Sequence, residues 1–340
     1  MIGLAIASCS AVAADAVGPV TGPASVASRS RVSIVQEPGA VEAYSAVPEK
    51  VRRLVTRGIL HFTGLTNENA AWRSLVSTQD VIGIKVHSIP GALSGTRPSV
   101  VSAVVEGLLN AGIAATNILI WDRQLTDLRL AGFGEVASKF KVRLASSMAE
   151  GFDAATFYDS PITGNLVWGD LEFEKKGDGV GRKSFVSKLV SKQMTKIIDI
   201  TPLLNHNQAG VAGHLLTLPL ASVDNTLRFE AQVDRLATAL PELYALPAVG
   251  DKVVLNITDA LVAQYQGEQR SLLHYSTALN QLWFSKDPVA LDTLAIQELS
   301  RQRRSTDAEQ AKSNMEIYSN AALLELGQSD VQNIQVDFKP

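Results

Sequence analysis

Short runs of apolar, often β-branched residues alternate along this chain with longer stretches in which apolar positions recur every three or four residues. The apolar runs lie at residues 32–35, 81–86, 117–121, 141–144, 196–200, 252–257, 282–284 and 334–338. The stretches with helical spacing lie at residues 49–62, 98–109, 230–240, 288–299 and 306–326. Apolar strands joined by helices are typical of a parallel sheet. The pattern therefore predicts an α/β fold, a mostly parallel sheet with helices on both faces.

Residues 156–190 interrupt this alternation. Short polar and aromatic runs there are separated by glycines at positions 164, 169, 177, 179 and 181. Because glycine punctuation is typical of turns, we expect an inserted hairpin or flap within one α/β domain over residues 31–340. The glycines at 177–181 follow no strand and lack the spacing of a dinucleotide site, which favours a flexible flap.

The N-terminal segment, residues 1–30, has the features of an export signal followed by a linker. Its first residues are small and apolar and reach an A-x-A pattern at residues 11–13. Residues 6–9 also fit a lipobox, which would leave a lipid on Cys9 and provide the only membrane attachment we expect. The alternative is an alanine-rich tail. We expect an exported protein, periplasmic or extracellular.

Composition narrows the classes of partner and cofactor. The formal net charge is -3, with 31 basic and 34 acidic residues mixed along the chain, so we expect no nucleic-acid partner. Hydrophobic residues make up 46% of the chain, which is ample for a buried core. Cys9 is the single cysteine, so a metal would need histidine, carboxylate or backbone oxygen ligands.

Several segments, taken together, resemble the DUF362 family over about residues 80–300. They are residues 81–86, Thr96 with Pro98, and residues 120–122, 195–200, 206–211, 255–259 and 287–292. The resemblance implies a protein that is often exported and has no generally assigned activity. Some members carry iron–sulfur modules, but this chain has no cysteine after position 9, so we expect no iron–sulfur cluster.

Two positions depart from the pattern that the resemblance implies. Family members commonly have lysines where this chain has Leu204 and Leu216. The run His206, Gly210 and Gly213 is also similar in its spacing to a site segment of the nickel-pincer lactate racemases.

Residues 205–214 provide the richest set of candidate site residues. They follow an apolar strand, and ligands bind at the carboxyl ends of strands in open α/β sheets. His206 and His214 are candidates for acid–base catalysis because imidazole exchanges a proton near neutral pH. Asn205 and Asn207 are candidates for contacting a substrate. The alternative is a glycine-rich loop leading into a packed helix at 211–218, with both histidines bonded to local backbone.

Three further polar residues are candidates for the same site. Lys85 ends a strand beside the loop that contains Thr96, and a cation there suits a carboxylate or phosphate. Lys85 is therefore a third candidate catalytic residue, and Thr96 and Asn225 are candidate substrate contacts. The alternatives are a solvated position for Lys85 and a turn at Asn225.

Carboxylates follow two of the predicted strands. Asp122 and Asp259, together with His206, are candidate ligands for a divalent metal. Either aspartate would also serve as a helix cap or turn residue. Asp287 precedes a proline and is expected to cap the next helix, and Asp292 on that helix is expected to be an exposed carboxylate.

Two functions remain open. The first is an exported enzyme that uses His206, His214 and Lys85 on a small anionic substrate, with metal assistance as an option, in an isomerase or hydrolase type of reaction. The second is a non-catalytic protein that binds a metabolite, a metal or a redox partner. Apolar Leu204 and Leu216 favour the second function.

Overall fold

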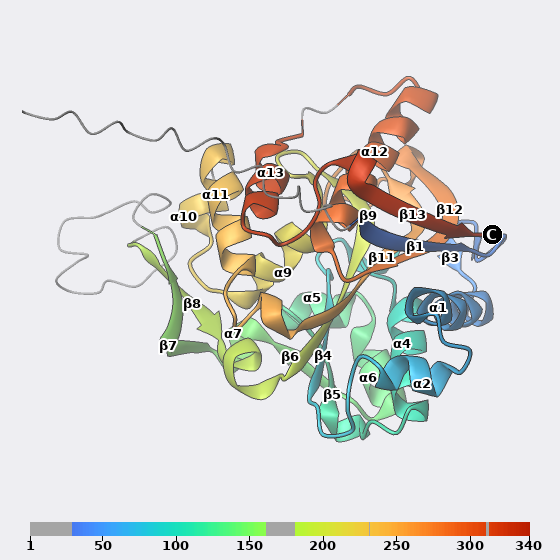
Figure 1. The fold of residues 1–340 in the computed structure, drawn as a ribbon, viewed down its shortest axis with the longest axis horizontal. Helices are drawn as coiled ribbons and strands as arrows, with labels where there is room; N and C mark the ends of the chain where they lie inside the picture. Colours follow the sequence, from blue (N-terminus) through green and yellow to red (C-terminus); the bar gives the residue numbers. More distant parts are fainter. Residues whose placement is uncertain (1–28, 161–180, 231, 311–312) are drawn as a thin grey trace, which may run out of the picture.

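The computed structural model describes residues 29–160, 181–230, 232–310 and 313–340 (Figure 1). The predicted export signal, including Cys9, lies outside these ranges, as do the glycines at 164–179. Within the described ranges, every helix is too short or too polar to cross a bilayer.

A central sheet has the strand order β13-β1-β12-β11-β9-β4-β5-β6. Its strands are β1 (Ser30–Gln36), β4 (Ile82–Val86), β5 (Ile118–Asp122), β6 (Arg143–Ser146), β9 (Lys196–His206), β11 (Val253–Gln264), β12 (Ser276–Ser285) and β13 (Ile334–Lys339). The strand β12 is antiparallel to both β1 and β11, whereas the other pairs along this order are parallel. The prediction of a mostly parallel sheet is confirmed.

Helices cover both faces of the sheet, as the sequence predicts (Figure 1). Alternate side chains of a strand point to opposite faces. Ile118 and Ile120 of β5 therefore pack in one apolar layer, and Leu119 and Trp121 pack in the other. The first layer includes helices α1 (Pro48–Thr63), α2 (Glu68–Arg73), α4 (Pro98–Asn110), α5 (Leu125–Leu130) and α6 (Phe133–Phe140). The second includes α9 (His214–Ser222), α10 (Leu227–Glu230), α11 (Val233–Tyr244), α12 (Pro288–Ser305) and α13 (Glu316–Leu323).

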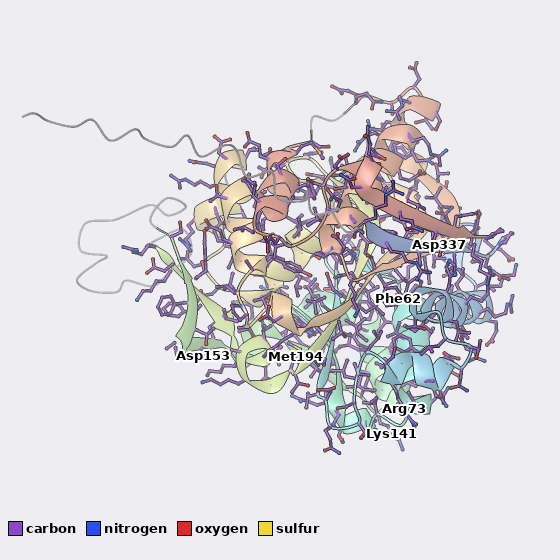
Figure 2. The ribbon with its side chains drawn as sticks, viewed as in Figure 1. Phe62, Arg73, Lys141, Asp153, Met194 and Asp337 are labelled. Atoms are coloured by element: carbon purple, nitrogen blue, oxygen red, sulfur yellow. The ribbon has the colours of Figure 1, made fainter. Side chains whose placement is uncertain are left out.

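Short elements complete the fold. They are β2 (Val41–Glu42), β3 (Ser45–Ala46), α3 (Gly91–Ser94), α7 (Ser147–Glu150) and β10 (Gly210–Val211), with single turns of other helix types between several strands. The predicted insertion contains an antiparallel pair, β7 (Phe152–Asp159) and β8 (Lys183–Ser187). Figure 2 shows Asp153 on β7 and Asp337 on β13 at opposite ends of the molecule.

Some element bounds differ from the predictions. The strand β9 continues to His206 because β10 pairs with its last residues and the side chains of Leu203 and Leu204 are buried. The strand β11 has 12 residues and continues to Gln264, beside β12 with 10 residues. The helix α13 is shorter than the predicted stretch at 306–326. Asp287 caps α12 as predicted, because its carboxylate accepts a hydrogen bond from the N–H of Ala290 at 2.8 Å.

Candidate functional site

A cavity of about 370 Å³ opens where β4, β5 and β9 end at the same edge of the sheet. Its polar lining includes His87, Asp122, Arg123, Gln124, Asn205, His206, Thr217, Thr226, Glu230, Glu268 and Gln269. Its apolar lining comes mainly from Leu204 and from α9, and it includes Leu216 and Leu220. This position, at the carboxyl ends of parallel strands, is where ligands bind in open α/β sheets.

His87 follows β4 and is 7% exposed. Its Nε2 atom is buried and has no hydrogen-bond partner among the described residues. Burial lowers the pKa of His87 to about 4, and Lys85 and His206 add to this effect, whereas Asp122 opposes it. The imidazole is therefore neutral at pH 7, and it lines the cavity with its Nε2 atom buried.

His206 ends β9 and is only partly buried. Burial lowers its pKa, although the nearby charges of Glu268 and Glu230 act in the opposite direction. Its Nδ1 accepts a hydrogen bond from the N–H of Ala209 at 3.1 Å. A neutral imidazole that accepts at Nδ1 carries its proton on Nε2. His206 therefore offers a hydrogen-bond donor at Nε2.

Asp122 ends β5 and lines the cavity beside His87. Burial alone would raise its pKa, but Lys85, His87 and the hydrogen bonds from Ser88 hold the pKa below its usual value. Both the N–H and the hydroxyl of Ser88 donate to Oδ2, at 2.8 and 2.7 Å. Asp122 is therefore an ionised carboxylate with most of its hydrogen-bonding capacity already used.

Lys85 lies behind this wall of the cavity and is fully buried. Its Nζ is 3.6 Å from Oδ1 of Asp122 and donates to the carbonyl of Val86 at 2.8 Å. Lys85 is absent from the cavity lining. Its charge compensates Asp122, and the structure does not present it to a ligand.

His214 lies in a buried polar network and does not line the cavity. Its Nδ1 is 2.7 Å from Oδ2 of Asp199. Its Nε2 lies 3.2 Å from the hydroxyl of Thr258 and 3.3 Å from that of Thr201. The structure therefore separates the two histidines of the segment 205–214, with only His206 at the cavity.

The expectation of an exposed Asp292 is wrong. Its side chain is buried and accepts hydrogen bonds from the N–H groups of His214 and Leu215, at 2.8 and 2.9 Å. Asp292 thus caps the start of α9 from a different helix, because the face of α12 that carries Asp292 packs against α9. A Cβ atom at Gly213 would overlap this carboxylate, which explains a glycine immediately before α9.

Three other candidates have structural partners and do not line the cavity. The hydroxyl of Thr96 accepts from the N–H of His87 and donates to the carbonyl of Ile200, so it positions His87. Asp259 is buried and forms an ion pair with Arg97 at 3.1 Å. Asn225 donates from Nδ2 to the carbonyl of Lys183 at 2.9 Å.

Asn205 and Asn207 both contact the loop that carries Glu268. The Oδ1 atom of Asn205 accepts from the N–H of Glu268, and the N–H of Asn207 donates to Oε1 of Glu268. Asn205 lines the main cavity, whereas Asn207 lines a neighbouring cavity of about 290 Å³ with His206, Glu230 and Glu268.

The predicted metal ligands do not come together. Within residues 29–160, 181–230, 232–310 and 313–340, no three His, Cys, Asp or Glu side chains form a group that could hold a metal ion. Each predicted ligand has another partner: Asp259 pairs with Arg97, Asp122 with Lys85, and His206 with the Ala209 N–H.

Several cavity residues, among them His87, Glu230 and Glu268, were not proposed as site residues from the sequence. His87 directly follows an apolar strand, and this position is a signal that could have identified it. Glu230 ends α10, and Glu268 lies in the loop after β11. No spacing in the sequence connects these two carboxylates, because tertiary packing alone brings them to His206.

Comparison with known proteins identifies the family. A family model described as a domain of unknown function, DUF362, matches residues 82–297. No curated protein matches the sequence. A crystal structure of a structural genomics target from Thermotoga maritima is similar, with a TM-score of 0.43 and 12% identity. The match covers 79% of this chain and 61% of that protein, so this chain spans less than two thirds of its length. Since the family model covers more than half of the sequence, the chain belongs to the DUF362 family.

Proposed function

We propose that this protein is an enzyme that binds a small organic molecule in the cavity and acts on it with His87 and His206. The observation that carries the proposal is the cavity at the carboxyl ends of β4, β5 and β9, which two neutral imidazoles line. The carboxyl ends of parallel strands are where small ligands bind in open α/β sheets.

The two histidines have complementary hydrogen-bonding roles. His206 presents a donor at Nε2, which suits an oxygen atom of the ligand that gains negative charge during a reaction. His87 is neutral, so its imidazole has a lone pair that can accept a proton. We place proton transfer, as in an isomerisation, first among the reaction types because both of these groups line the cavity.

The second candidate function is binding without turnover. Leu204 and Leu216 form part of the apolar wall, at the two positions where the family resemblance implies lysines. A protein that retains the cavity but not those charges would bind a metabolite without converting it. Turnover therefore distinguishes the two functions.

The first test measures the melting temperature of the protein against a panel of small amines, carboxylates, hydroxy acids and sugars. We expect at least one compound to raise the melting temperature. At a concentration one hundred times its Kd, such a compound should raise the free energy of unfolding by about 2.7 kcal/mol. Leu227 lines the cavity and is 54% exposed, so Leu227→Trp should block binding without disturbing the core. Leu130, 79% exposed and outside the cavity lining, provides the matched control Leu130→Trp.

Compounds that bind are then followed by NMR for chemical conversion. The proposal expects conversion by the wild-type protein, with rates reduced roughly 10²-fold or more in His87→Gln and in His206→Gln. Binding without conversion would support the second function instead. A panel that leaves the melting temperature unchanged, or binding that Leu227→Trp retains in full, would contradict the cavity as the site.

A further inference from the structure

Two carboxylates at the cavity have no compensating cation among the described residues. Glu230 and Glu268 both line the main cavity and the neighbouring one, and His206 lines both cavities with them. The described ion pairs nearby are Lys85 with Asp122 and Arg97 with Asp259, and they involve neither glutamate. His206 does not compensate them either, because burial keeps its imidazole neutral.

The charges lining the main cavity are therefore unbalanced. Among the residues that the structure describes, its carboxylates are Asp122, Glu230 and Glu268, and its one lining cation is Arg123. Lys85 compensates Asp122 from behind the wall. The guanidinium of Arg123 donates to the carbonyl oxygens of Leu220 and Val223, which holds it against α9. Negative charge remains in excess, which disfavours the anionic substrate expected from Lys85.

The apolar part of the cavity lining indicates which kind of group the ligand carries. Ile89, Leu204, Leu216 and Leu220 provide an apolar wall next to the carboxylates. Such a wall favours an alkyl or aromatic group. The neutral imidazole of His87 also lines the cavity and can accept a hydrogen bond from a ligand.

We propose that the ligand is an organic amine whose ammonium group lies between Glu230 and Glu268 and whose apolar body packs against Leu204 and Leu216. This inference rests on the proposed function, in which the cavity holds a small molecule. An ammonium group carries three donors and no acceptor, which matches the two carboxylates at the cavity.

The test compares three unbranched six-carbon probes with different head groups: hexylammonium, hexan-1-ol and hexanoate. Isothermal titration calorimetry measures their affinities for the wild-type protein. We expect hexylammonium to bind about tenfold or more tightly than the alcohol, the scale of a charge-assisted hydrogen bond. Hexanoate should bind most weakly of the three.

Variants then locate the ammonium group. Glu230→Gln and Glu268→Gln should each reduce the preference for hexylammonium over hexan-1-ol by about tenfold or more. Glu316→Gln removes the same charge from an exposed position on α13 and should leave the preference unchanged.

Three results would overturn the amine inference: equal or tighter binding of the alcohol or of hexanoate, a preference that survives both cavity variants, or no binding of hexylammonium. None of these results decides the proposed function, which the compound panel and Leu227→Trp test separately. Loss of panel binding would remove both proposals, whereas panel binding by non-amines would remove only this one.

Discussion

Replacing His214 with alanine is expected to lower the free energy of unfolding by about 4 kcal/mol. The imidazole is fully buried and pairs with Asp199 at 2.7 Å, and its positive charge also lowers the pKa of Asp292. Removing it leaves two buried carboxylates without this partner and creates a cavity beside the sheet. Urea denaturation, followed by tryptophan fluorescence, measures the change.

His274→Ala is the matched control, because His274 is exposed and lies in the loop before β12. Its effect should stay within about 0.5 kcal/mol. A decrease of less than about 1 kcal/mol in the unfolding free energy of His214→Ala would contradict the buried network, because removing one partner of a buried ion pair is strongly destabilising.

Lowering the pH from 6.5 to 4 is expected to cost about 3 kcal/mol of stability through His87 alone. Its pKa is about 4 in the folded protein, against an ordinary value of 6.5, mainly because of burial. The unfolded chain therefore binds a proton below pH 6.5 that the folded protein does not bind until about pH 4. This contribution to stability is complete above pH 6.5 and is lost as the pH falls toward 4.

Asp292 acts in the opposite direction. Burial raises its pKa to about 6 from an ordinary value of 3.8, so the folded protein binds a proton before the unfolded chain does as the pH falls. Protonation of Asp292 thus favours folding between pH 6 and 4, by about 3 kcal/mol. In the wild-type protein, these two groups together should make the free energy of unfolding depend only weakly on pH, because their contributions largely cancel.

Denaturation of the wild-type protein and His87→Gln, repeated across pH 4 to 7, separates the two contributions. The variant should lack the loss due to His87, so the difference in unfolding free energy between the two proteins should change by about 3 kcal/mol over this range. For Asp292→Asn, the difference in unfolding free energy from the wild-type protein should change with pH in the opposite direction. A pH-independent difference for His87→Gln would mean that the imidazole is not held in its neutral form.

The parts of the fold that depend on local pattern could be predicted from the sequence. The meeting of Asp122 and His206 at one edge was predictable because carboxyl ends of parallel strands meet there, although β9 runs past its predicted end at residue 200 to His206. The cap formed by Asp287 was predictable because it needs only its own helix.

The surroundings of individual side chains could not be predicted in the same way. Lys85 lies on a strand that is buried on both faces, so the alternation of side chains along β4 does not identify a solvent-exposed face. The burial of His214 depends on Thr258 and Asp292, which are distant in sequence. Glu268 reaches the cavity from a loop whose position follows from the unexpected length of β11.

The central claim is that two neutral histidines, one a donor and one an acceptor, face a small molecule in this cavity. Nitrogen-15 NMR of the ring nitrogens at pH 7 tests it most directly, with His87→Gln and His206→Gln used for assignment. The account predicts two neutral rings, the proton of His206 on Nε2, and shifts of both rings when a compound from the panel binds. A protonated ring at either position, a proton on Nδ1 of His206, or binding that leaves both rings unshifted would contradict it.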